Sequence, residues 1–292
     1  MNVNAQTIAH PKAKNPWSDA WHSLKKNRMA LIGGVVLLIF ILIAVFADFI
    51  APHPADEQDW MHIMEGPSAA YPLGTDSYGR CVFSRIVYGS RISLLVGFVA
   101  VAFSAVGGGI VGACAGYFRG RLDNVLMRLM DVLLAIPSIL LAIAIVNILG
   151  PSLINVMIAV GLSSMPSFAR IVRAAVLSIR DSEFIEAAVA IGDSTPAIIW
   201  HNILPNCLAP IIVQATLGVA SAILSAAGLS FLGLGLQPPS PEWGAMLSEG
   251  RAYIYVAPWL TICPGVSIVL VVLSLNLFGD GLRDALDPKL KQ

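Results

Sequence analysis

Six long stretches of this chain contain no lysine, arginine, aspartate or glutamate. They are residues 29–47, 92–118, 132–149, 152–169, 194–241 and 252–279. A helix needs about 20 mainly apolar residues to cross a bilayer, and one charge at its centre costs about 2.5–3.5 kcal/mol. Charged residues make up 12% of the chain, whereas a soluble domain carries about 25%. We therefore predict an all-α integral membrane protein with six transmembrane helices.

The distribution of lysine and arginine predicts how these helices are oriented. If the N-terminus is cytoplasmic, fourteen of the 18 basic residues fall on the inner side and four on the outer side. Cytoplasmic segments carry such an excess of positive charge. The N-terminus, the C-terminus and the segment between residues 169 and 208 are therefore predicted to be cytoplasmic.

The first apolar stretch, Met29 to Ile50, raises the alternative of a signal peptide, because Val45-Phe46-Ala47 is a possible cleavage site. Its charge-free core of residues 29–47 is longer than the 7–15 residues of a typical signal core. A long basic tail, residues 1–28, also precedes it. We therefore predict an uncleaved first helix.

The inner segment between the fourth and fifth apolar stretches has the sequence features of short helices rather than of an irregular loop. Ser182 followed by Glu183 and Glu186 predicts a capped helix start. Gly192 and Pro196 then interrupt the helix. The sequence predicts two short helices that meet at a bend on the cytoplasmic face.

This segment resembles the signature loop of ABC-type importer permeases, Glu-Ala-Ala, three residues, Gly, nine residues, Ile-x-Leu-Pro. The matching positions are Glu186, Ala187, Ala188, Gly192, Leu204 and Pro205, and Asp193 is taken as part of the same loop. The departure is Asn202, with Ile203 one place later than the pattern has it. The resemblance implies a type I ABC importer permease fold in which this loop docks on a separate ATPase subunit. An ordinary solvated helix pair is the alternative.

Residues 51–91 form the large outer segment. Apolar residues recur between arginines over 82–87, which predicts a short interfacial amphipathic helix. The run from Leu73 to Arg91 resembles peptide and nickel importer permeases, with Cys81 where that pattern has Asp. The run from Pro238 to Leu247 resembles them too. We expect contacts with a sister subunit or an external binding protein from Asp76, Arg80, Arg85, Arg91 and Trp243; a helix that only frames the bundle is the alternative.

Smaller signals concern the packing of the helices. Gly108, Gly112 and Gly116 share one helix face and predict a close helix–helix seam. Arg128 and Asp131 are spaced to pair across one turn. Gly150-Pro151 divides residues 132–169 into a helical hairpin, and Pro137 and Pro166 are expected to kink their helices.

The chain lacks the motifs of an enzyme. It has no P-loop, no His-Glu-x-x-His and no Gly-x-Ser-x-Gly. Its four cysteines are widely spaced without metal-ligand patterns. We predict no catalytic residue, no metal and no bound cofactor, and we expect ATP and magnesium to be used by partner subunits.

These observations favour one half of a transmembrane permease pair in a bacterial inner membrane. The expected partners are a homologous sister permease, two ABC ATPase subunits, a substrate-binding protein, membrane lipid and a peptide substrate, with no nucleic acid. The alternatives are glutathione-like peptides or a nickel chelate as substrate, an ATP-independent secondary transporter or channel, and a membrane scaffold or enzyme. The expected organisation is a tail (1–28), a first helix (29–50), an outer segment (51–91), a five-helix core (92–280) with coupling loop 173–207, and a tail (281–292).

Overall fold

The chain folds into a bundle of long helices. The computed structural model describes residues 16–286, with side chains from residue 21 onward. Lys12, Lys14, Lys289 and Lys291 lie outside the described residues. The helices are α1 (Pro16–Lys26), α2 (Arg28–Val45), α3 (Ala47–Ile50), α4 (Val82–Phe118), α5 (Gly120–Ala135), α6 (Ser138–Leu149), α7 (Leu153–Ile179), α8 (Glu183–Ala190), α9 (Thr195–Ala197), α10 (Leu208–Phe231), α11 (Trp243–Gly250) and α12 (Trp259–Leu286). A π-helical turn (Ile198–Ile203) and 3₁₀ turns (Leu204–Cys207 and Arg251–Tyr253) complete them.

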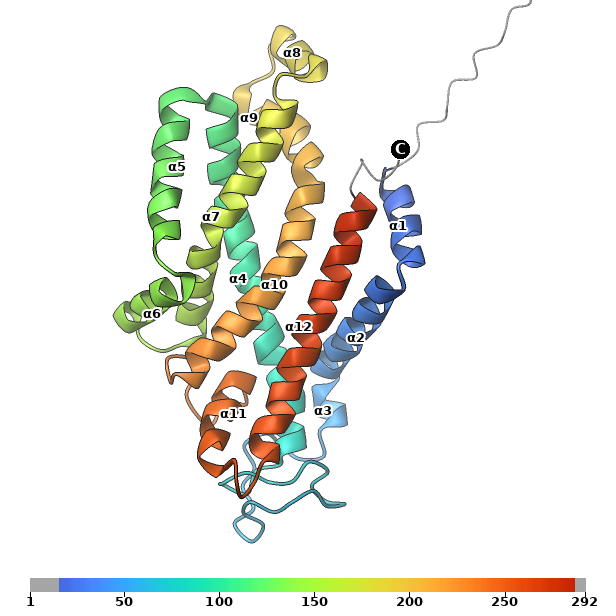
Figure 1. Ribbon diagram of the computed structural model, residues 1–292, viewed down its shortest axis with the longest axis vertical. Helices are drawn as coiled ribbons and strands as arrows, with labels where there is room; N and C mark the ends of the chain where they lie inside the picture. The colour runs from blue at the N-terminus through green and yellow to red at the C-terminus, as the bar shows by residue number, and fades with distance from the viewer. Residues whose placement is uncertain (1–15, 287–292) are drawn as a thin grey trace, which may run out of the picture.

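The long helices run roughly along one axis (Figure 1). At one end lie α1, α8, α9 and the last turns of α12; at the other lie α3, α11 and the segment between α3 and α4. Within residues 16–286, five helices are long and apolar enough to cross a membrane, and the bent pair α5–α6 allows a sixth span. The predicted all-α membrane architecture is confirmed, with α1 and the end of α12 at the same end as α8.

The third predicted span is not one straight helix. α5 ends at Ala135, Ile136 adopts an extended conformation before Pro137, and α6 leaves at 91° to α5. A proline cannot donate the helical hydrogen bond and restricts the residue before it to extended backbone. The predicted kink is therefore a full break. The predicted hairpin at Gly150-Pro151 is confirmed, because α6 ends at Leu149 and α7 begins at Leu153.

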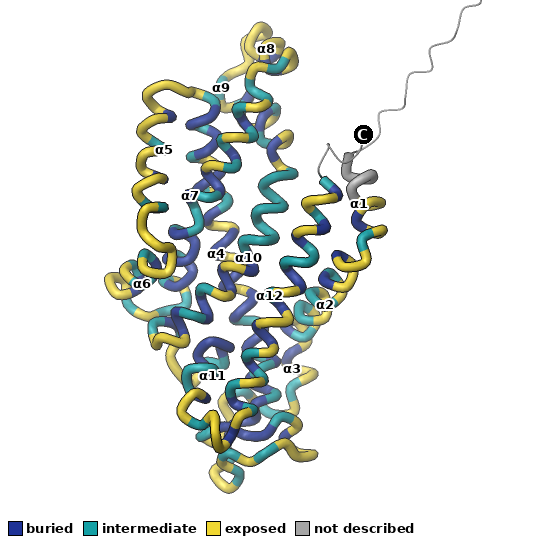
Figure 2. Tube along the Cα trace, viewed as in Figure 1, coloured by how far each residue is buried: buried dark blue, intermediate teal, exposed yellow. Residues whose placement is uncertain are grey.

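The glycine seam is confirmed. It joins α4 to α7, where the tube along the chain is largely buried (Figure 2). A Cβ atom on Gly112 would lie 2.3 Å from the carbonyl oxygen of Ala169, and one on Gly108 would lie 2.6 Å from that of Met165. Gly116 faces Val176 in the same way. Three glycines at four-residue spacing thus let two backbones touch along three turns.

Two sequence predictions are wrong. Residues 82–91 do not form a separate interfacial helix, because they are the first turns of α4, which continues unbroken for 37 residues. Arg128 does not pair with Asp131; the partner of Asp131 is Arg170 on α7, with Nη2 at 2.6 Å from Oδ1. In the second case a residue distant in sequence outcompetes the local ion pair.

Candidate functional site

Residues 180–207, between α7 and α10, lie in the segment predicted to be cytoplasmic, and we call them the inner loop. They form a compact cap on the ends of α4 and α7. Ile185 and Ala188, on one face of α8, are buried at 3% and 4% exposure. They pack with Ala113 of α4, Val172 and Val176 of α7, and Ile198, Ile203 and Cys207 of the following turns. Half-buried Leu204 packs against the same cluster. α8 is therefore held to the bundle by a small core of its own, at the tip of the molecule (Figure 1).

The two ends of α8 are set by the residues that the sequence singled out. Ser182 occupies the N-cap position, but its hydroxyl donates to the carbonyl of Ile179 at 2.5 Å rather than accepting from the helix. At the other end Gly192 has φ of +90°, a conformation that favours glycine. The amide of Asp193 then donates to the carbonyl of Ala188 at 3.1 Å, which closes the helix end.

The opposite face of α8 is open. Glu186, Ala187, Gly192, Asp193 and Pro205 are exposed. Large apolar side chains accompany them, and these were missed in the sequence: Phe184 (46% exposed), Val189 (55%), Ile191 (80%) and Trp200 (68%). The sequence could have indicated them, because large apolar residues in a segment predicted to be polar and exposed need a partner to cover them. Large exposed apolar groups rimmed by polar residues mark interaction surfaces.

A hollow of about 450 Å³ separates α8 from the end of α4. Its lining consists of Tyr117, Phe118, Arg180, Asp181, Ile185, Glu186, Val189 and Ala190. Arg119 reaches across to Asp181, with Nη2 at 2.7 Å from Oδ2, and the Arg180 guanidinium lies over the Tyr117 ring at 5.8 Å. The loop therefore touches the last turn of α4 through polar contacts and leaves a recess beside Glu186.

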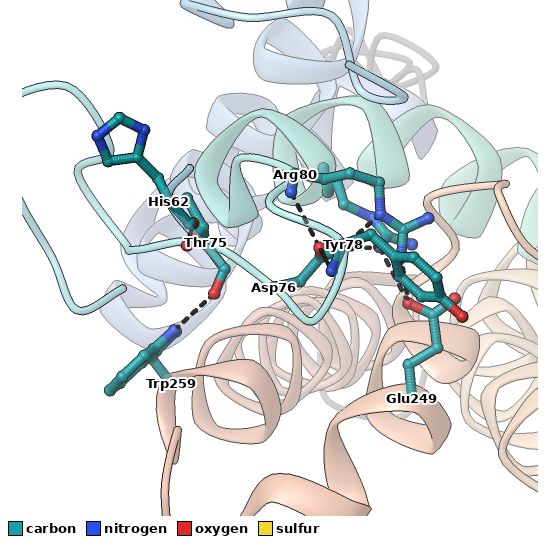
Figure 3. A network of polar contacts seen from close by, with 8 residues as sticks. His62, Thr75, Asp76, Tyr78, Arg80, Glu249 and Trp259 are labelled. Atoms are coloured by element: carbon teal, nitrogen blue, oxygen red, sulfur yellow. Dashed lines mark hydrogen bonds and ion pairs between the residues drawn. The ribbon is translucent and has the colours of Figure 1, made fainter. Parts of the chain in front are cut away.

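Four charged side chains meet at the other end of the bundle. Arg80 Nε lies 2.7 Å from Asp76 Oδ2, and Arg80 Nη2 lies 2.8 Å from Glu249 Oε2 (Figure 3). Arg85 Nη1 contacts Asp76 Oδ2 and lies 3.0 Å from Glu249 Oε2. Both arginines are only 1% exposed. The two positive and the two negative charges cancel, and a charged group can be buried at low cost only when it is paired in this way.

Neighbouring groups fix the loop that carries this cluster. Asp76 Oδ1 accepts from the amides of Tyr78 and Arg80 at 2.8 and 2.9 Å. The indole of Trp259, at the start of α12, donates to the carbonyl of Thr75 at 3.1 Å (Figure 3). Gly79 has φ of +72°, and a Cβ atom there would lie 2.0 Å from the Asp59 carbonyl oxygen. The outer segment is thus folded onto α11 and α12.

The five residues predicted to contact a partner at the outer face fall into a buried group of four and one partly exposed residue. Asp76, Arg80, Arg85 and Trp243 are buried within this chain; Trp243 is 0% exposed, and its indole donates to the carbonyl of Ile86 at 3.1 Å. These four side chains therefore contact other residues of this chain, and their contact with a partner stays a prediction. Arg91 keeps a partly exposed side chain paired with Asp48 at 2.8 Å. Glu249, which completes the cluster, was missed, because nothing local in the sequence links it to Arg80.

The comparisons with known proteins agree with this architecture. Residues 108–292 match the family described as the binding-protein-dependent transport system inner membrane component. The chain belongs to this family. Residues 15–67 of this inner membrane component also match the N-terminal TM domain of oligopeptide transport permease C. It is thus a multi-pass inner membrane transport component, as predicted.

Curated relatives cover nearly the whole length of this inner membrane component. The dipeptide transport system permease protein DppC of Alkalihalophilus pseudofirmus is 53% identical over 96% of this chain and 92% of its own length. DppC of Haemophilus influenzae is 46% identical over 96% and 97%. The glutathione transport system permease protein GsiD of Escherichia coli O157:H7 is 45% identical over 99% and 96%.

A solved structure shows the same fold for the core of this inner membrane component. The native crystal form of the inward-facing MetNI methionine ABC transporter matches with a TM-score of 0.58 and 23% identity. The match covers 70% of this chain and 97% of that one. The predicted ABC importer permease fold is therefore confirmed.

Proposed function

We propose that this chain is one of two permease subunits of an ATP-driven importer for di- and oligopeptides. Its relatives named as dipeptide permeases, at 46–53% identity over most of the chain, support this substrate class. A relative named as a glutathione permease, at 45% identity, supports a glutathione-like peptide as the second candidate.

The geometry of α8 is the observation that carries the mechanism. Ile185 and Ala188 fix α8 to the ends of α4 and α7, while Glu186, Ile191 and Trp200 face outward at the tip of the bundle. A short helix that is packed on one face and apolar on the other is suited to dock in a groove. Force applied to α8 would pass directly to α4 and α7 through their shared core.

The coupling partner in this proposal is a pair of cytoplasmic ABC ATPases, which bind ATP and magnesium. ATP-driven closure of the ATPases moves α8 and alternates access to a path between this chain and a homologous sister permease. A substrate-binding protein delivers the peptide from the outside. The exposed Glu186, Gly192, Asp193 and Pro205 form the docking face, and Leu204 and Ala188 support it from beneath.

A charge reversal on α8 tests the proposal. The full set of subunits is reconstituted in proteoliposomes, and ATP-dependent peptide uptake is compared for Glu186→Lys and Asp284→Lys. Both residues are exposed; Glu186 lies in α8, and Asp284 lies in the last turn of α12, which ends at the same end of the molecule as α8. We expect Glu186→Lys to abolish uptake and ATPase association, and Asp284→Lys to retain both.

The competing function makes the opposite prediction. Peptide uptake by this chain alone, without ATPase subunits, would establish an ATP-independent secondary transporter or channel. Normal ATP-dependent uptake by Glu186→Lys combined with Gly192→Pro would show that α8 does not couple the two activities.

A further inference from the structure

Helix α5 exposes two different faces side by side. Arg121, Asn124, Arg128 and Asp131 are all exposed, and their spacing of three, four and three residues places them in one stripe, which we call the polar stripe. Leu122, Val125, Leu129 and Val132 are also exposed and have the same spacing one residue further on; this is the apolar stripe. Successive residues of a helix are rotated by about 100° about its axis. The two stripes therefore lie side by side around α5 and cover the same length of it. Most of α5 is drawn as exposed in Figure 2.

The polar stripe extends far along the helix. Asp131 is eleven residues beyond Gly120, a rise of about 17 Å. Its partner Arg170 is nine residues before the end of α7, about 14 Å from that end. This ion pair is open on one side, because the two side chains are 54% and 56% exposed. It therefore lies well along α5–α6, the pair that together has the composition of a membrane span.

The two stripes require different surroundings. Val125, Leu129 and Val132 are more than half exposed and suit contact with hydrocarbon. A charged group that faces hydrocarbon costs several kcal/mol, about 2.5–3.5 at mid-membrane. The Asp131–Arg170 pair at the same depth as Val132 must therefore face water or polar protein. α5 thus stands on the boundary between lipid and a polar compartment.

The charges of the stripe indicate what that compartment receives. Asp131 is neutralised by Arg170, whereas Arg121 and Arg128 form no ion pair with any side chain of residues 21–286. Two turns of helix separate these guanidinium groups, a rise of about 10 Å. Guanidinium groups bind carboxylates through charge-assisted hydrogen bonds. The unpaired charges favour a mobile anion and water over a fixed apolar neighbour.

We propose that the polar stripe of α5 lines a water-filled vestibule that opens at the α8 end, and that Arg121 and Arg128 receive the carboxylate of the transported peptide there. The identity of that ligand rests on the proposed function; the presence of water does not. The vestibule wall would comprise Asn124, Arg128 and Asp131 of α5 with Arg170 of α7.

Adjacent cysteines on α5 test the vestibule. Asn124→Cys and Val125→Cys are compared in the assembled transporter in inside-out membrane vesicles, using a membrane-impermeant charged methanethiosulfonate. The four native cysteines, at 81, 114, 207 and 263, can remain, because peptide mass analysis separates them from residues 124 and 125. A thiol in apolar surroundings stays protonated and unreactive. We expect position 124 to react at least about tenfold faster, the effect of one pKa unit.

Equal rates at the two positions, or no reaction at either, would overturn the vestibule. The carboxylate is tested by adding Ala-Ala dipeptide or its C-terminal amide during labelling of Asn124→Cys. We expect the dipeptide, and not the amide, to slow labelling, and we expect Arg128→Gln but not Arg128→Lys to remove that protection. Equal protection by both compounds, or none, would overturn the carboxylate assignment. Labelling needs no transport, so these results stand apart from the outcome of the uptake assay.

Discussion

Arg85 Nη1 and Glu249 Oε2 lie 3.0 Å apart, although 164 residues separate them in the chain. The contact joins the first turns of α4 to the end of α11. Arg85 Nε and Nη2 and Glu249 Oε1 are buried without a partner among the described residues. A cavity of about 10 Å³ adjoins Arg85 and Glu249, which is the space that a single water molecule needs.

The buried charges predict a non-additive response to substitution. Glu249→Ala leaves two buried cations against one carboxylate, and we expect it to lower the free energy of unfolding by about 3 kcal/mol. The double variant Arg85→Met with Glu249→Met keeps the balanced Asp76–Arg80 pair, so it should recover most of that loss. Thermal unfolding of the purified protein in detergent measures both. Equal or greater destabilisation in the double variant would contradict the prediction.

The α4–α7 seam predicts a contrast between two glycines on one helix. Gly112→Ala places a methyl group 2.3 Å from the Ala169 carbonyl oxygen, so the two helices must separate. We expect a destabilisation of about 1–3 kcal/mol, as in other overpacked sites. Gly109 has nothing within 4 Å of its Cβ position. Gly109→Ala should therefore stabilise slightly, by up to about 1 kcal/mol from helix propensity. The same thermal assay measures both variants. Equal melting temperatures for Gly112→Ala and Gly109→Ala would contradict the close contact of α4 with α7 at Gly112.

The outer segment carries a polar cluster that predicts pH dependence. Hydrogen bonds from Tyr71, then His62, lower the pKa of Asp59 below its usual 3.8. The Asp59 carboxylate raises the pKa of His62 above its usual 6.5 and that of Tyr71 to about 12. The His62 contribution is complete below pH 6.5 and is lost as pH rises through its raised pKa. The Asp59 contribution is complete above pH 3.8 and is lost as pH falls through its lowered pKa.

Residues 59–75 should therefore be most protected between about pH 4 and 6.5, the range that the ordinary pKa values bound. Hydrogen exchange, corrected for the intrinsic pH dependence of amide exchange, measures this protection. His62→Gln removes the loss above pH 6.5 and serves as the control. An unchanged pH profile in that variant would assign the effect to another group.

The backbone of Gly192 makes a further prediction for the inner loop. Its φ of +90° is unfavourable for a side chain, while the space around it is open. Gly192→Ala should therefore act through backbone strain alone, at about 1–2 kcal/mol. We expect faster proteolysis between α8 and α9 with no change in the melting of the bundle. Asn tolerates this backbone region better than Ala, so Gly192→Asn should be cut more slowly than Gly192→Ala.

The sequence was sufficient for the features that depend on local composition. Charge-free stretches located five of the spans, and Gly192 and Pro196 located the breaks in the inner loop. The side-chain partners depend on tertiary structure and could not be predicted. Asp131 had a suitable neighbour in Arg128 and instead pairs with Arg170 of α7, 39 residues away in the chain. Arg80 and Arg85 fitted an interfacial helix until Glu249 supplied the charge that allows their burial.

The continuity of α4 has a mechanical consequence. Its first turns carry Arg85, and its last turn carries Phe118 beside the hollow under α8. Thirty-seven residues without a break amount to a stiff rod about 55 Å long. Because a rod cannot absorb motion along its length, a tilt of about 10° at one end displaces the other by about 10 Å. A displacement at the α8 end and a change in the shape of the opposite surface are therefore one movement.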